Sequence, residues 1–259
     1  MTTETTYETL PIGQPRFPFA SWLISPIHLF LFWCILLGFH IPLMIARLFG
    51  QRTIGAVYTL LCGAHVANIK LSGTHIHFTQ EQPLPVDRPL ILVSNHQSMY
   101  DIPCLVWFLR QHHPRFIAKK ELTKYIPSIS FALRHCNHLL IDRDDPHSAV
   151  EQITSYAKTV EQNRTTICIF PEGTRAKDAK MKRFKSRGLE TLLKEIPSAL
   201  VVPIALDGFA HLVKKKFFPF PYGETATLQV FSPLEPSQYS AKELTAVCER
   251  QIRNALGQS

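Results

Sequence analysis

The chain has 259 residues, enough for one large domain or for a domain with an accessory segment. Its formal net charge of +8 indicates an anionic partner, such as lipid head groups, phosphorylated compounds or nucleic acid. The six cysteines are scattered and form no Cys-x-x-Cys pair, so neither a disulfide framework nor a structural zinc site is expected.

The N-terminal part contains a long stretch without charge. No Asp, Glu, Lys or Arg occurs between Arg16 and Arg47, and this stretch is long enough for a membrane helix of about 20 residues. His28, His40 and Pro42 suit an interfacial or re-entrant segment instead, and a buried core helix is a further alternative. The arginines after the stretch predict that the rest of the chain lies on the cytoplasmic side.

A second apolar stretch follows Gly50. Ile54, Val57, Tyr58 and Leu61 recur at helical spacing. We expect a helical hairpin that turns at Gly50 and holds the remainder of the chain against the membrane. The predicted organisation is an N-terminal tail at 1–20, a hydrophobic helical membrane-anchoring hairpin at 21–70 and an α/β domain at 71–259.

From residue 72 onward, short apolar runs alternate with helical patterns. This alternation predicts an α/β fold with a largely parallel mixed sheet flanked by helices, and the nearly continuous apolar character of the runs suits a sheet covered on both faces. The expected strands are THIHF, PLILVS, RFIAK, HLLID, TTICIF, ALVVPIAL and TATLQVF. The expected helices are Ile102–Arg110, Pro146–Glu161, Ser186–Lys194 and one near Ala241–Leu256.

His96 follows the strand PLILVS, and Asp101 comes five residues later. An imidazole with a nearby carboxylate can take a proton from an alcohol, because the carboxylate fixes the tautomer and stabilises the imidazolium. The same residues have a structural interpretation, since Ser98 and Asp101 match a capping box that opens the next helix. Both interpretations can hold for Asp101.

Two further strands end in polar groups. HLLID leads to Arg143, and TTICIF leads to a turn of Pro, Glu, Gly, Thr and Arg at 171–175. Glycine allows close backbone approach to a ligand, and arginine can bind a phosphate through two parallel hydrogen bonds. If the sheet is parallel, these groups and His96 converge on one edge. A base, its carboxylate and two arginines there would suit transfer to a phosphorylated alcohol.

The motifs NHQSMYD and FPEGTR resemble the first and third signatures of the glycerolipid acyltransferase family. NHLLIDR is similar to the family's second motif and VVPIAL to its fourth, and the order of motifs holds from about residue 70 to 235. Asn137 stands where the second motif commonly has Gly, and Leu140 where Phe is common. Because Asn tolerates left-handed backbone, the turn can be kept.

The resemblance implies direct acyl transfer, with no acyl-enzyme and no bound cofactor or metal. His96, oriented by Asp101, would deprotonate the acceptor hydroxyl, which attacks the thioester of acyl carrier protein (acyl-ACP) or coenzyme A (acyl-CoA). The best-known family members act on 1-acyl-sn-glycerol 3-phosphate (lysophosphatidic acid) in phospholipid synthesis, so this acceptor and the lipid bilayer are the expected partners. The resemblance implies substrate-binding roles for Glu172, Gly173, Thr174, Arg175, Arg143, Lys119, Lys120, Lys185 and Pro203.

Several alternatives stay open. The same chemistry could serve glycerol 3-phosphate, a lyso-ornithine lipid or a lysophospholipid. A non-catalytic basic protein that binds membranes is a distant alternative, and no nucleic-acid module is recognisable. A metal-dependent hydrolase would need His135 and His138 beside His96 and Asp101, which is not a recognised ligand cluster. The basic run at 177–187 can be a solvated surface, or a contact for anionic lipid or acyl carrier protein.

Overall fold

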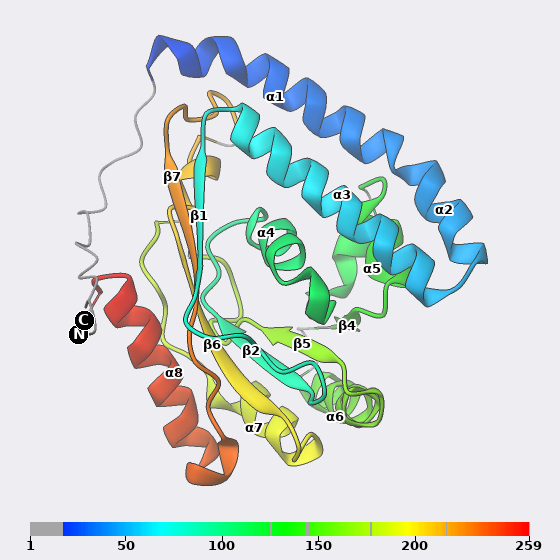
Figure 1. The fold of residues 1–259 in the computed structure, drawn as a ribbon, viewed down its shortest axis with the longest axis vertical. Helices are drawn as coiled ribbons and strands as arrows, with labels where there is room; N and C mark the ends of the chain where they lie inside the picture. Colours follow the sequence, from blue (N-terminus) through cyan, green and yellow to red (C-terminus); the bar gives the residue numbers. More distant parts are fainter. Residues whose placement is uncertain (1–17, 125, 143–145, 177, 216, 259) are drawn as a thin grey trace.

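The structure, a computed structural model, describes residues 18–124, 126–142, 146–176, 178–215 and 217–258 (Figure 1). A seven-stranded sheet forms its centre, in the order β1-β7-β6-β2-β5-β3-β4. The strands are β1 (His75–Gln80), β2 (Leu90–Ser94), β3 (Arg115–Lys119), β4 (Leu139–Ile141), β5 (Thr166–Ile169), β6 (Leu200–Asp207) and β7 (Thr225–Val230).

The strand directions place five carboxyl ends at one edge of the sheet. β2 is parallel to both β5 and β6, and β3 is parallel to both β5 and β4. β7 runs antiparallel to β6, and β1 is parallel to β7. The predicted largely parallel mixed sheet is therefore confirmed, and the segments that follow β2, β3, β4, β5 and β6 begin at the same edge.

Helices cover both faces of the sheet (Figure 1). On β2, Leu90 and Leu92 belong to one buried apolar cluster, whereas Ile91 and Val93 belong to a second cluster on the opposite face. Because both faces of β2 are buried, its sequence is continuously apolar, as expected for a central parallel strand. The first cluster packs under α3 (Gln51–Leu71), α4 (Asp101–Phe108) and α5 (Ile129–His135), and the second under α6 (Pro146–Asn163), α7 (Ser186–Glu195) and α8 (Ala241–Ala255).

The four helices expected after residue 72 are present as α4, α6, α7 and α8, with ends that differ by at most two residues. α5 was not expected, because its seven residues are too few to display a helical repeat. The Asn at the unusual position of the second motif has φ +56°, so the left-handed turn expected at Asn137 is present.

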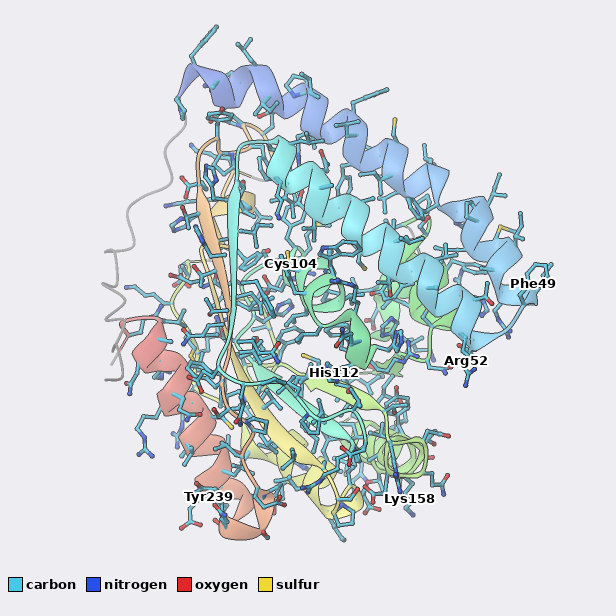
Figure 2. The ribbon with its side chains drawn as sticks, viewed as in Figure 1. Phe49, Arg52, Cys104, His112, Lys158 and Tyr239 are labelled. Atoms are coloured by element: carbon cyan, nitrogen blue, oxygen red, sulfur yellow. The ribbon has the colours of Figure 1, made fainter. Side chains whose placement is uncertain are left out.

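Two apolar helices form an outer layer over α3 (Figure 1). They are α1 (Phe19–Gly38) and α2 (His40–Leu48), and Gly50, with φ +95°, lies in the turn that leads into α3. Phe49 and Arg52 lie at the tip of this turn, away from the sheet (Figure 2). By length and composition alone, Phe19–Leu48 and Gln51–Leu71 could each cross a membrane.

The polarity of α1 is inverted relative to a helix on a water-soluble surface. Its buried side chains include Ser21, Ser25 and His28, while Phe30 is 67% exposed and Leu37 is 60% exposed. A contiguous exposed apolar surface marks a contact with a membrane or with another protein. The outer face of α1 and α2 carries Phe19, Trp22, Leu23, Ile27, Phe30, Trp33, Leu37, Ile41, Met44, Ile45 and Leu48.

Candidate active site

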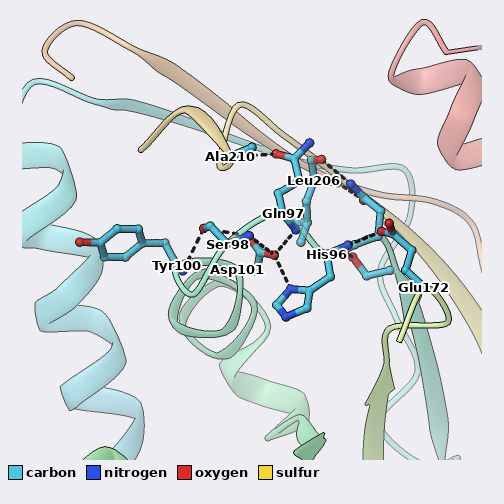
Figure 3. A network of polar contacts seen from close by, with 10 residues as sticks. His96, Gln97, Ser98, Tyr100, Asp101, Glu172, Leu206 and Ala210 are labelled. Carbon is cyan, nitrogen blue, oxygen red and sulfur yellow. Dashed lines mark hydrogen bonds and ion pairs between the residues drawn. The ribbon is translucent and has the colours of Figure 1, made fainter. Parts of the chain in front are cut away.

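His96 and Asp101 are in contact at the carboxyl end of β2. His96 Nδ1 lies 2.7 Å from Asp101 Oδ2 (Figure 3). A carboxylate accepts hydrogen bonds, so Nδ1 carries the proton and Nε2 presents its lone pair. Among the described residues His96 Nε2 has no hydrogen-bond partner, and the side chain is 12% exposed. This is the geometry that a general base requires.

Asp101 also organises the loop before α4. It is fully buried, and its Oδ2 accepts hydrogen bonds from the backbone N–H groups of Gln97 (2.7 Å) and Ser98 (2.9 Å). The Ser98 hydroxyl donates to Asp101 Oδ1 at 3.2 Å and accepts from the backbone N–H of Tyr100. Asp101 is the first residue of α4, and the N-cap of this helix is Tyr100, which makes no side-chain capping bond. The capping box expected from Ser98 and Asp101 is therefore not formed, and the carboxylate holds the preceding loop while it orients the imidazole.

Two side chains that the sequence analysis did not single out hold this loop. The Phe170 ring stacks on the His96 imidazole with centroids 4.1 Å apart and planes inclined by 16°, which fixes the plane of the base. Asn95 bonds both the N–H and the carbonyl of Leu206 at 2.8 Å, which joins the loop to β6. Asn95 and Phe170 are the first residues of the motifs NHQSMYD and FPEGTR, and that position was the available signal.

Glu172 braces the loop after β2 against the loop after β5. Its side chain is buried, Oε1 accepts from the backbone N–H of His96 at 2.7 Å, and Oε2 accepts from that of Lys182 at 2.8 Å (Figure 3). The carbonyl of His96 in turn accepts from Ala176 N–H. Burial raises the pKa of the Glu172 carboxyl above its ordinary value. Both carboxylate oxygens thus contact protein backbone.

The Pro-Glu-Gly-Thr-Arg turn lies directly beside this brace. Gly173 has φ +73°, and Lys185 Nζ would lie 3.8 Å from a Cβ at this position, so the Lys185 ammonium lies over the turn. Thr174 is exposed and Arg175 is partly exposed. Within the described part of the chain, Arg175 makes no hydrogen bond or ion pair, which leaves its guanidinium able to bind an anion.

The remaining predicted site residues lie in different surroundings. Lys119 ends β3 and pairs with Glu121 at 3.5 Å, and the exposed Lys120 follows it at the same edge of the sheet. Pro203 is buried inside β6, opposite Val93 of β2, and does not lie at a strand end. Arg143 lies outside the described residues.

The residues of the alternative metal site do not come together. His138 Nδ1 accepts a hydrogen bond from the backbone N–H of Phe116, and His135 Nδ1 bonds Arg47 instead. Burial lowers the pKa of His138 to about 3, consistent with a neutral structural imidazole. In the described part of the chain, no three His, Cys, Asp or Glu side chains are grouped so that they could hold a metal ion.

A family model with the description acyltransferase matches residues 75–207, just over half of the chain. The chain belongs to the acyltransferase family. The matched region begins at β1 and ends at β6, and it includes both the His96–Asp101 pair and the turn that carries Glu172. The family resemblance noted from the motifs is thereby confirmed.

Three curated relatives match between 61% and 82% of this chain. A 1-acyl-sn-glycerol-3-phosphate acyltransferase of Cocos nucifera is 31% identical over 160 residues, which are 61% of this chain and 50% of the relative. The chain thus spans half the length of that relative. A Saccharomyces cerevisiae protein with the same description is 23% identical, covering 82% of this chain and 69% of the relative. The Homo sapiens beta enzyme is 26% identical, covering 78% and 77%.

A solved structure shares the fold of this acyltransferase. The crystal structure of the 1-acyl-sn-glycerophosphate acyltransferase PlsC from Thermotoga maritima superposes with a TM-score of 0.74 at 24% sequence identity. The match covers 91% of this chain and 94% of that one, so it includes most of the N-terminal helices as well as the sheet.

Proposed function

We propose that the chain transfers a fatty acyl group from a thioester to the sn-2 hydroxyl of 1-acyl-sn-glycerol 3-phosphate, giving phosphatidic acid. The observation that carries this proposal is the His96–Asp101 pair, 2.7 Å apart, at the carboxyl edge of the sheet. The named relatives, all described as 1-acyl-sn-glycerol-3-phosphate acyltransferases, support the choice of acceptor.

The proposed reaction needs no covalent enzyme intermediate. His96 Nε2 takes the proton of the acceptor hydroxyl as its oxygen attacks the thioester carbonyl, and Asp101 stabilises the imidazolium that forms. The tetrahedral intermediate then collapses, the C–S bond breaks, and the proton passes to the leaving thiolate. The new ester and a free thiol are the products. Ser98 is occupied as a brace of Asp101 and is not a nucleophile in this scheme.

Cationic groups at the sheet edge would bind the acceptor phosphate. Arg175 is available for a bidentate contact, and Lys185 lies over the turn beside it. We assign supporting roles to Lys119 and Lys120 at the end of β3, and to Arg143 from its place in the sequence. In this scheme Glu172 acts by bracing the loop, Gly173 and Thr174 shape the phosphate contact, and Pro203 shapes the sheet under the acyl group.

The donor would approach along the basic segment at 180–187, which leads into α7. Its exposed cations are Lys180, Lys182, Arg183, Lys185 and Arg187, and the stretch 178–187 contains one acid, Asp178. The segment is joined to the active-site turn because the N–H groups of Lys182 and Lys185 bond Glu172 and Pro171. A thioester of acyl carrier protein or coenzyme A carries the negative charge that such a surface favours.

The exposed apolar face of α1 and α2 would lie in the lipid. We infer that these helices hold the enzyme at the membrane, with the sheet and its helices on the cytoplasmic face. This placement brings the active-site edge to the surface from which a lysolipid is supplied. The inverted polarity of α1 supports it, because apolar side chains face outward and serine and histidine face inward.

The test measures acyl transfer by purified protein in vesicles, with each donor, to lysophosphatidic acid, glycerol 3-phosphate, lyso-ornithine lipid and lysophosphatidylcholine. We expect phosphatidic acid as the main product and loss of at least about 100-fold in kcat for His96→Ala. His77→Ala, which removes an exposed histidine from β1, is the matched control and should keep the wild-type rate. Transfer only to another acceptor would contradict the proposed substrate, and full activity of His96→Ala would contradict the proposed base.

A further inference from the structure

His28 is buried on the inner face of α1 and joins three parts of the chain. Its Nε2 lies 2.8 Å from the Tyr100 hydroxyl, and its Nδ1 lies 2.7 Å from the Ser72 hydroxyl. The Ser72 hydroxyl donates to the carbonyl of Asn68 at 2.7 Å, so it accepts from His28 Nδ1–H. His28 Nε2 is then unprotonated and accepts from Tyr100 O–H.

Tyr100 carries this contact into the active-site loop. It immediately precedes Asp101, and its backbone N–H bonds the Ser98 hydroxyl at 3.0 Å, which in turn donates to Asp101. Figure 3 shows the Tyr100 ring directed away from the His96 imidazole, with Ser98 and Asp101 between them. A continuous series of hydrogen bonds and backbone therefore connects α1 with the base.

The surroundings leave Tyr100 little freedom to move. Its side chain is 1% exposed, and the ring of Phe220 stacks on His28 with centroids 3.9 Å apart. Asn68 Nδ2 donates to the backbone carbonyl of His28, so α1 is bonded to α3 at the same point. Polar groups buried this deeply hold one arrangement, because each alternative would leave a donor or acceptor without a partner.

We propose that His28 is a positioning residue for acyl transfer, which acts through Tyr100 to hold Ser98, Asp101 and His96 in the reactive arrangement. It would thereby couple the position of α1 in the lipid to the geometry of the active site. The inference rests on the proposed function, because the rate of acyl transfer is its readout. His28 touches no substrate in this scheme.

The test compares two substitutions that keep different halves of the imidazole. Gln places an acceptor near the position of Nε2 and can keep the bond to Tyr100, whereas Asn reaches only the position of Nδ1 and keeps the bond to Ser72. We expect His28→Asn and Tyr100→Phe each to lower kcat about tenfold, with KM for lysophosphatidic acid within about twofold of wild type. His28→Gln should keep kcat within about threefold of wild type. The double variant, His28→Asn with Tyr100→Phe, should be no slower than either single variant.

Ser21→Ala is the matched control, because Ser21 lies on the same face of α1 but accepts from Tyr222 N–H, outside the active-site loop. It should keep the wild-type kcat. Three outcomes would each overturn the inference while leaving the proposed function in place. They are equal losses of kcat for His28→Asn and His28→Gln, an effect on KM alone, and a wild-type kcat for Tyr100→Phe. Tyr100→Phe probes the same bond if His28→Asn fails to fold. Absence of acyl transfer by the wild type would overturn both the inference and the proposed function.

Discussion

The two helical layers of this acyltransferase are built on opposite patterns. On α8, Leu244, Cys248 and Ile252 are buried, and charged side chains such as Arg250 face outward. On α1, serines and a histidine face the protein, and large apolar side chains face outward. The molecule thus has one helical layer suited to water and another, packed on α3, suited to an apolar environment. The active-site loop contacts the second layer through Tyr100.

The largest effect is expected when charged side chains replace apolar ones on the outer face of α1. Phe30→Lys with Trp33→Lys places two charges where apolar side chains would lie in lipid. We expect vesicle binding to fall at least about 100-fold, because burial of each ring contributes about 1.5–3 kcal/mol and a buried lysine costs about as much again. Flotation with vesicles measures this.

The control adds the same charge to the other layer. Ala246→Lys with Asn254→Lys changes two exposed positions of α8 and should leave vesicle binding unchanged. If the two double variants bind equally well, or are weakened equally, the outer face of α1 is not the lipid contact.

The second prediction compares one leucine from each layer. Leu192 of α7 is fully buried, and Leu37 of α1 is 60% exposed. Leu192→Ala should lower the free energy of unfolding by about 2–5 kcal/mol, because it leaves a cavity in the core. Leu37→Ala should change it by less than about 0.5 kcal/mol in detergent. Denaturant titration at one detergent concentration gives both values, and a costly Leu37→Ala would show that this face is packed against protein.

The third prediction compares two serines that accept backbone hydrogen bonds. Ser25 of α1 is fully buried and accepts from Phe220 N–H at 2.6 Å, whereas Ser240 caps α8 in exposed surroundings and accepts from Glu243 N–H at 3.3 Å. Ser25→Ala should cost about 1–3 kcal/mol, because water cannot replace the lost partner. Ser240→Ala should cost nearer 1 kcal/mol. The same titration would contradict the account if the order were reversed.

The smallest effect concerns Glu172, which connects the active-site loop to the segment that leads to α7. Since burial raises its pKa above 4.5, the folded chain binds this proton more readily than the unfolded chain. Its contribution to stability is therefore largest in acid and declines as the pH rises from about 4.5 through the raised pKa. Glu172→Gln should lack this decline when unfolding is measured from pH 4 to 7. Parallel curves for the two proteins would show that burial does not control this carboxyl.

The order of strands and helices could be predicted because each element carries its own periodicity. The continuous apolar run of β2 indicated a buried parallel strand, and parallel strands imply a common edge for His96 and Glu172. The reversed direction of β1 and β7 within the sheet has no corresponding pattern in the local sequence, and α5 is too short to show a helical repeat.

Contacts between residues far apart in the chain could not be predicted from the sequence. His28 and Tyr100 are 72 positions apart, and nothing near either residue indicates that they meet. His28 read as an unfavourable residue in an apolar helix, and only the fold shows that it faces inward. Likewise, the motif indicated that Glu172 belongs to the site, but its bonds to two backbone N–H groups depend on how two loops pack.

The most direct test of the account is the kcat of Asp101→Asn with lysophosphatidic acid. The amide oxygen of Asn can still accept from Gln97, Ser98 and His96 Nδ1, so the loop and the tautomer are kept while the negative charge is lost. If Asp101 stabilises the imidazolium formed on His96, kcat should fall about 100-fold or more, with KM and the circular dichroism spectrum unchanged. A kcat within threefold of wild type would contradict the assignment of His96 and Asp101 as the base and its carboxylate.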